Sequence, residues 1–290
     1  MPLQLAVLKT RAITAVFFVA IMLSGIFWNQ WSYLLLFIFI HFGCWYEYKK
    51  LLFQIDPSYR QVNFIHPASI QIAGGGFVLS GCMDSFRMGE MKFSHWGQNL
   101  FIAFFILFFL NEFFFNRTRN FRHSIYALSG FLYVSLACYF MMCLYGNIHH
   151  RVFADQPDYV MPSMLIATIW VNDTMAYLVG SLIGKTPLSP VSPKKTIEGT
   201  LGGLVLSVLV VTFTATYYFL LPIIPVLVLT SLTAIAGTWG DLLESKLKRM
   251  AGVKDSGQIM PGHGGFLDRF DSLLIAATIV GLVFCLWYSG

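Results

Sequence analysis

The sequence predicts an all-α, polytopic integral membrane protein with about nine transmembrane helices. The prediction rests on the composition, on the lengths of the apolar runs and on the placement of the basic residues. Hydrophobic residues make up 57% of the 290 residues and charged residues only 11%, against roughly 25% charged residues in an average soluble protein. A soluble protein of this length could not cover its surface with so few charged side chains, so a soluble fold is excluded.

The apolar runs predict where the helices lie. A bilayer core about 30 Å thick requires about 20 apolar residues per helix. Suitable runs occupy residues 12–28, 31–48, 65–83, 98–116, 124–146, 159–184, 200–222, 224–241 and 272–288. The first is interpreted as a retained helix, because it lacks a small-residue cleavage site and the second run follows at once. The third contains Gly74, Gly75 and Gly76, so a re-entrant or kinked segment is an alternative there.

The basic residues predict the orientation. When the nine runs alternate across the membrane, 16 of the 19 Lys and Arg residues fall in loops on one side. Cytoplasmic loops carry the excess of basic residues. The N-terminus and the two most polar loops are therefore expected in the cytoplasm, and the C-terminus outside. The size and simplicity of the chain suit a bacterial inner membrane. The five cysteines have no CxxC spacing, which argues against a disulfide framework or a zinc site.

The two halves of the chain differ in where their polar residues lie. Residues 1–158 are expected to form about five N-terminal spans, and residues 159–290 a catalytic region of about four spans with cytoplasmic active-site loops. Asn172 and Asp173 stand in the middle of a span in the second region. A charge there costs about 2.5–3.5 kcal/mol on insertion scales, which favours a functional site over an interhelical hydrogen-bonded pair.

The loop after that span is the second polar stretch. Three prolines within residues 184–199 prevent a continuous helix. Ser192, Lys194, Lys195 and Thr196 offer hydroxyl and ammonium donors that suit phosphate oxygens. Contact with anionic lipid headgroups would explain the same residues equally well.

Residues 241–272 form the third and richest polar stretch. If residues 241–249 are helical, Asp241 and Ser245 share one face with Lys248 or Arg249. If the last span opens near residue 268, two aspartates lie one turn apart on it. Between these segments, Gly264 and Gly265 allow a ligand to approach the backbone closely.

This third stretch has the composition of a magnesium–phosphate site. Hard divalent cations take oxygen ligands, typically one or two carboxylates together with substrate phosphates. Asp241, Asp268 and Asp271 supply the carboxylates, and the neighbouring Lys and Arg residues supply charges for phosphates. Interfacial salt bridges and a polybasic lipid anchor are the alternative, but they do not explain acidic residues beside an anionic leaflet. Elsewhere, Glu47 is interpreted as interfacial and His149–His150 as a solvated pair.

Several segments together resemble the phosphatidate cytidylyltransferase family, the CDP-diacylglycerol synthases. Residues 245–249 (SKLKR), 254–255 (KD) and 261–271 (PGHGGFLDRFD) match the family pattern S-x-x-K-R-x4-K-D … P-x-H-G-G-x-x-D-R-x-D at every fixed position. Residues 172–177 (NDTMAY) and 192–199 (SPKKTIEG) are similar to family segments as well. Met260 departs from the usual Leu, Ile or Phe, which changes side-chain shape and not chemistry.

The resemblance implies a reaction of phospholipid biosynthesis, in which CTP and phosphatidic acid give CDP-diacylglycerol and pyrophosphate with magnesium. The lipid phosphomonoester has a second pKa of about 6 and is largely a dianion at neutral pH. It is already a nucleophile, so no dedicated base is needed. Catalysis would consist of positioning and charge neutralisation.

The resemblance also implies roles for individual residues. One or two divalent ions would be held by Asp241, Asp268 and Asp271. The residues expected to bind phosphates and take part in catalysis are Lys248, Arg249, Lys254, His263 and Arg269. Those expected to bind substrate are Asn172, Asp173, Ser192, Lys194, Lys195, Thr196, Ser245, Gly264 and Gly265.

Two other functions remain open. A CTP-using lipid kinase of the dolichol or phytol type would transfer the γ-phosphate, but the 245–271 pattern favours cytidylyl transfer. A secondary transporter would also place Asp173 in mid-span, but it should show two related halves. The expected partners are CTP, phosphatidic acid and the bilayer, with no nucleic acid. Small residues near 180–184 and 199–203 permit a homodimer.

Overall fold

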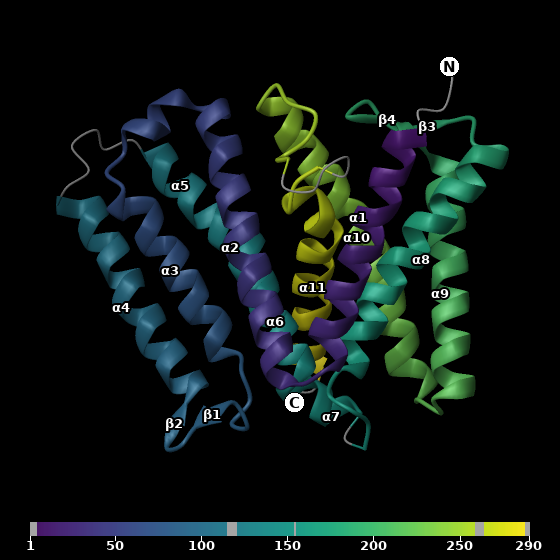
Figure 1. Cartoon of the computed structure of the whole chain (residues 1–290), viewed down its shortest axis with the longest axis horizontal. Helices are drawn as coiled ribbons and strands as arrows, with labels where there is room; N and C mark the ends of the chain where they lie inside the picture. The colour runs from purple at the N-terminus through teal and green to yellow at the C-terminus, as the bar shows by residue number, and fades with distance from the viewer. Residues whose placement is uncertain (1–4, 115–120, 154, 259–263, 288–290) are drawn as a thin grey trace. The chain divides into compact units, whose positions relative to one another are not determined.

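The structure, a computed structural model, describes residues 5–114, 121–153, 155–258 and 264–287 (Figure 1). It confirms the all-α prediction, since nearly all regular structure is helical. The helices are α1 Leu5–Phe27, α2 Gln30–Ile55, α3 Ile65–Ser80, α4 Phe93–Phe114, α5 Phe121–Gly130, α6 Leu136–Tyr145, α7 Asn147–Val152, α8 Val160–Ile183, α9 Ile197–Tyr218, α10 Ile223–Met250 and α11 Leu267–Trp287. A 3-10 turn, η1, covers Pro57–Gln61 and a π-helical turn, η2, covers Phe131–Ser135. The strands are β1 Arg87–Met88, β2 Met91–Lys92, β3 Pro187–Ser189 and β4 Ser192–Thr196.

The helices support a protein that crosses the membrane several times. Within the described residues, six helical segments are long and apolar enough to span a bilayer: α4, residues 121–145, α8, α9, α10 and α11. The apolar part of α1 is shorter, covering Ala12–Phe27, and α3 has 16 residues. The multi-pass prediction is thus confirmed, while the count of nine stays a prediction. The run at 65–83 forms one helix, which ends at Ser80.

The chain divides into two compact units. Unit 1 contains residues 1–142 and 247–270, and unit 2 contains residues 143–246 and 271–290. Helices α10 and α11 each continue from one unit into the other. The predicted functional boundary at residue 158 stays a prediction.

Unit 1 contains a close helix pair, α3 and α4, which lie side by side (Figure 1). Gly76 on α3 faces Gly97 on α4, and a Cβ at Gly97 would lie 2.6 Å from the Gly76 carbonyl oxygen. Small residues allow two helix backbones to approach, which is how helices pack tightly in a bilayer. The glycine run that weakened the span prediction is therefore a packing surface.

In unit 2, α8 and α9 lie side by side and are joined by the β3–β4 hairpin (Figure 1). Pro187 pairs with Thr196, and Ser189 with Ser192. The prolines prevent a helix, as predicted, and the segment forms a hairpin instead. Thr196 then caps α9 by accepting a hydrogen bond from the Gly199 amide at 3.2 Å.

Candidate active site

Three carboxylates gather in unit 2. Asp241 and Glu244 lie one turn apart on α10, and Asp271 lies in the first turns of α11. One carboxylate oxygen from each residue lies within 4.8 Å of the others. Glu244 is fully buried and Asp271 is 9% exposed, whereas Asp241 is half-buried. The structure thus brings together two of the three predicted metal ligands and adds Glu244.

Close contact between the α10 and α11 backbones produces this group. A Cβ at Gly240 would lie 3.0 Å from the Ser272 Cα and closer still to the Asp271 carbonyl oxygen. Glycine at position 240 therefore allows Asp241 and Asp271 to approach. Two unit negative charges 4.8 Å apart repel by about 3.5 kcal/mol at an effective dielectric constant of ~20. Such a group requires protons or a cation for compensation.

The β3–β4 hairpin contributes a positive charge to this group. Lys195 on β4 forms an ion pair with Asp241. Lys195 is also close enough to Asp173 on α8 to interact with it electrostatically. Sequence segments at 172–173, 195 and 241 therefore converge within unit 2. Asn172 is buried and Asp173 is exposed.

The rest of the hairpin lies open to ligands. Ser192 and Thr196 are half-buried and Lys194 is exposed. Glu198 accepts hydrogen bonds from the backbone amides of Lys185 and Thr186 at 3.1 and 3.2 Å. These two bonds fix the base of the hairpin. The Lys194 ammonium lies at the surface of the hairpin.

Asp268 lies in unit 1 and is surrounded by donors. Its Oδ1 pairs with Lys248 Nζ at 2.6 Å. Its Oδ2 accepts from the Ser256 amide at 2.9 Å, the Ser256 hydroxyl at 2.9 Å and the Gly265 amide at 2.8 Å. The loop between α10 and α11 covers residues 251–266, of which the structure describes 251–258 and 264–266. Asp268 holds these two described parts together through Ser256 and Gly265. Its predicted role as a metal ligand stays a prediction.

The remaining predicted residues are placed as follows. Arg249, Lys254 and Arg269 are exposed, and Ser245 is half-buried. Among the described residues, Arg249 and Lys254 form no ion pair. Gly264 has φ +82°, a conformation that favours glycine. His263 lies outside the described residues, so its predicted role stays a prediction.

Sequence reasoning missed one acidic residue, Glu244, and misinterpreted Glu47 and His149. Glu244 follows Asp241 by three residues on one helix, a spacing that could have revealed it. Glu47 is 1% exposed and contacts the α10–α11 loop, so the interfacial interpretation was wrong. His149 is buried and its Nε2 lies 2.8 Å from the Gln156 carbonyl, so it is not solvated; burial lowers its pKa.

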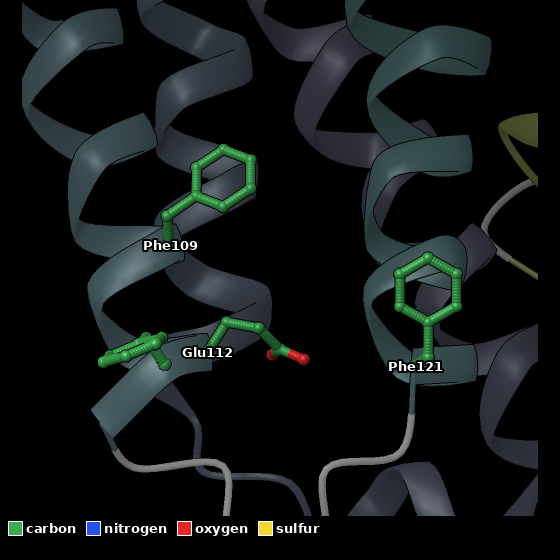
Figure 2. Close-up of a pocket in the computed structure, with 4 residues that line it drawn as sticks. Phe109, Glu112 and Phe121 are labelled. Carbon is green, nitrogen blue, oxygen red and sulfur yellow. The ribbon is translucent and has the colours of Figure 1, made fainter.

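A separate pocket of about 510 Å³ lies in unit 1 between α4 and α5 (Figure 2). Phe109, Glu112, Phe113 and Phe121 line it. Glu112 accepts a hydrogen bond from Ser124 and lies 3.1 Å from His66 Nε2. Among the described residues, none of the predicted site residues lines this pocket.

Comparisons with known proteins show a family and several similar bacterial proteins. The model of the cytidylyltransferase family matches residues 9–287. A phosphatidate cytidylyltransferase of Staphylococcus haemolyticus is 39% identical over 168 residues, which cover 56% of this chain and 64% of that protein. The Bacillus subtilis protein of that name is 40% identical over 160 residues, covering 54% of this chain and 59% of its own. The matched part spans less than two thirds of these relatives.

Proposed function

Because the chain belongs to the cytidylyltransferase family, we propose that it transfers CMP from CTP to phosphatidic acid, giving CDP-diacylglycerol and pyrophosphate. The 245–271 pattern and the names of the similar bacterial proteins support this assignment. The single observation that carries it is the group of three carboxylates on α10 and α11, with Lys195 beside it. A nucleotidyl transfer between two anionic phosphates requires such a concentration of charge.

The carboxylate group fits a magnesium ion. Its three oxygens are hard ligands, and two of the three side chains are buried. When bound, one or two such ions would neutralise charge on the α-phosphate and the leaving pyrophosphate. Asp241, Glu244 and Asp271 would hold the first, and Asp268 is the candidate ligand for a second.

The basic residues would bind the substrate phosphates. Lys248 carries an ammonium with three N–H donors, one of which it uses on Asp268. Further positive charge comes from exposed residues: Arg249 on the last turn of α10, Lys254 on the loop and Arg269 on the first turn of α11. Arginine suits phosphate because its planar fork can donate two parallel hydrogen bonds.

The chemical step needs positioning more than proton transfer. An oxygen of the lipid phosphate dianion attacks the α-phosphorus of CTP, and the bond from that phosphorus to the bridging oxygen of pyrophosphate breaks. No proton has to leave the nucleophile. Gly264 would let the triphosphate approach the backbone, whereas Gly265 is buried and packs against Glu47. Asn172, Asp173, Ser192, Lys194 and Thr196 would line the nucleotide pocket.

The basic loops indicate where this reaction takes place. The positive-inside rule puts the hairpin and the α10–α11 loop on the cytoplasmic side of the inner membrane, where CTP is available. The α10 helix has 28 residues and is about 42 Å long. It therefore extends beyond a hydrocarbon core of about 30 Å and can carry its C-terminal charges into water.

The test is a transfer assay with purified protein, α-labelled CTP and phosphatidic acid in mixed micelles. We expect label in the lipid fraction, loss of that label with EDTA, and recovery with excess Mg²⁺. Omitting phosphatidic acid is the control for adventitious labelling. Label that stays in the aqueous phase with all components present would contradict the proposal.

A further inference from the structure

Glu47 is a buried carboxylate with no place in the reaction described so far. It lies on α2, a helix of mostly apolar residues, and is 1% exposed. A buried ionised carboxylate is strongly destabilising unless hydrogen bonds or opposite charges compensate it. Its contacts therefore show what the residue does.

Glu47 binds the segment between α10 and α11 at two points, Ser256 and Leu267. Its Oε2 accepts a hydrogen bond from the Ser256 hydroxyl at 2.6 Å and from the Leu267 amide at 2.8 Å. Leu267 is the first residue of α11, where backbone amides lack partners within the helix. A carboxylate there also interacts favourably with the positive end of the helix dipole. A side chain of α2 thus caps α11 and ties down Ser256.

The loop backbone packs directly against this carboxylate. A Cβ at Gly257 would lie 2.7 Å from Glu47 Cδ, and a Cβ at Gly265 would lie 2.5 Å from it. Both glycines are buried. Positions 257 and 265 therefore have no room for a side chain while Glu47 is in place, which gives the second glycine of the HGG motif a physical reason.

Ser256 connects Glu47 to Asp268. The Ser256 hydroxyl lies 2.6 Å from Glu47 Oε2 and 2.9 Å from Asp268 Oδ2. It carries one proton, so it donates to one carboxylate at a time. Asp268 meanwhile accepts from the Gly265 amide at 2.8 Å. Two carboxylates from different helices thus hold Ser256 together with the segment 265–267.

We propose that Glu47 is a positioning residue that holds residues 256–257 and 265–267, between α10 and the start of α11, in the conformation that binds the nucleotide triphosphate. The inference rests on the proposed function, which assigns CTP binding to Lys254 and Gly264 in this loop. Glu47 acts through Ser256, Leu267 and the two glycines and does not itself touch the substrate.

The first test compares Glu47→Ala and Glu47→Gln with the unsubstituted protein. A glutamine oxygen can accept the same two hydrogen bonds, so Glu47→Gln should keep kcat/KM for CTP within about threefold. Alanine removes both bonds, and we expect at least about a tenfold rise in KM for CTP with an unchanged KM for phosphatidic acid. The matched control is Glu112→Ala, which removes another hydrogen-bonded carboxylate of unit 1 far along the chain from the loop.

The second test does not depend on activity. Hydrogen exchange of the Ser256, Gly265 and Leu267 amides should speed up at least about tenfold in Glu47→Ala and not in Glu112→Ala. Ser256→Ala should show the same direction of change, and it covers the case in which Glu47→Ala does not fold.

Unchanged exchange at these amides in Glu47→Ala would overturn the inference, as would equal KM changes for both substrates or a failure of Glu47→Gln to restore CTP binding. If the unsubstituted protein transfers no label from CTP, the proposed function fails. The exchange measurement still decides whether Glu47 holds the loop.

Discussion

Replacing Gly265 by alanine should abolish most activity, because the added methyl group would collide with the Glu47 carboxylate. The new Cβ would lie 2.5 Å from Glu47 Cδ, whereas non-bonded carbons settle about 3.5–4.0 Å apart. Either the loop or Glu47 must therefore move by about 1 Å. A displacement of about that size in a catalytic group can reduce turnover roughly 100-fold, and an extra methyl in a packed site costs about 1–3 kcal/mol of stability.

The assay measures transfer from α-labelled CTP alongside the thermal midpoint of the protein in detergent. Gly237→Ala is the matched control, since its Cβ would meet its nearest atom at 3.5 Å, an ordinary contact. We expect the control to transfer normally and Gly265→Ala to lose about 100-fold in kcat/KM. Transfer by Gly265→Ala within threefold of normal would refute the packing of Glu47 against this loop.

Four further predictions follow from the geometry. Asp268→Asn should reduce cytidylyl transfer at least about 100-fold, because it removes the charge paired with Lys248; normal turnover in membrane-inserted protein would contradict this. Asp271→Asn should raise the Mg²⁺ concentration for half-maximal activity at least about tenfold, as measured by metal titration; an unchanged titration would remove Asp271 from the metal site. Gly199→Ala should lower the thermal midpoint, because its Cβ would lie 2.7 Å from the Ala176 carbonyl oxygen. This overlap costs about 1–3 kcal/mol, more than alanine gains over glycine in helix propensity. A raised midpoint would contradict close α8–α9 packing. Burial lowers the pKa of His149, so neutral His149 stabilises the fold fully above the unfolded pKa of about 6.5, and this stabilisation is lost as the pH falls below that value. His149→Gln should therefore make the thermal midpoint fall less steeply at acidic pH. An identical pH profile of the midpoint in both proteins would contradict this.

Much of the fold could be predicted because a bilayer leaves few choices. A run of about 20 apolar residues must satisfy its backbone internally, so it forms a helix. The prolines at 187, 190 and 193 could equally be recognised as breaking a helix. The prolines alone do not predict the β3–β4 hairpin. Its register depends on Glu198 binding the Thr186 amide and Thr196 binding the Gly199 amide, at the two ends of the hairpin.

The site was predictable in its residue types and less so in its pairings. Asp241 and Asp271 could be recognised as charges at span ends, and the structure places them together. Asp268 looked equivalent in the sequence, but its carboxylate binds Lys248, Ser256 and Gly265. Glu47 could not be found in this way, because its partners lie 209 and 220 residues further along the chain and no local spacing indicates them.

The most direct test of nucleotidyl transfer is to follow two labels in parallel reactions with phosphatidic acid. One reaction contains CTP labelled at the α-phosphate and the other CTP labelled at the γ-phosphate, with Asp268→Asn protein as the blank. We expect the α-label in the lipid and the γ-label in pyrophosphate. Recovery of the γ-label in lipid would show phosphoryl transfer instead and would contradict the account.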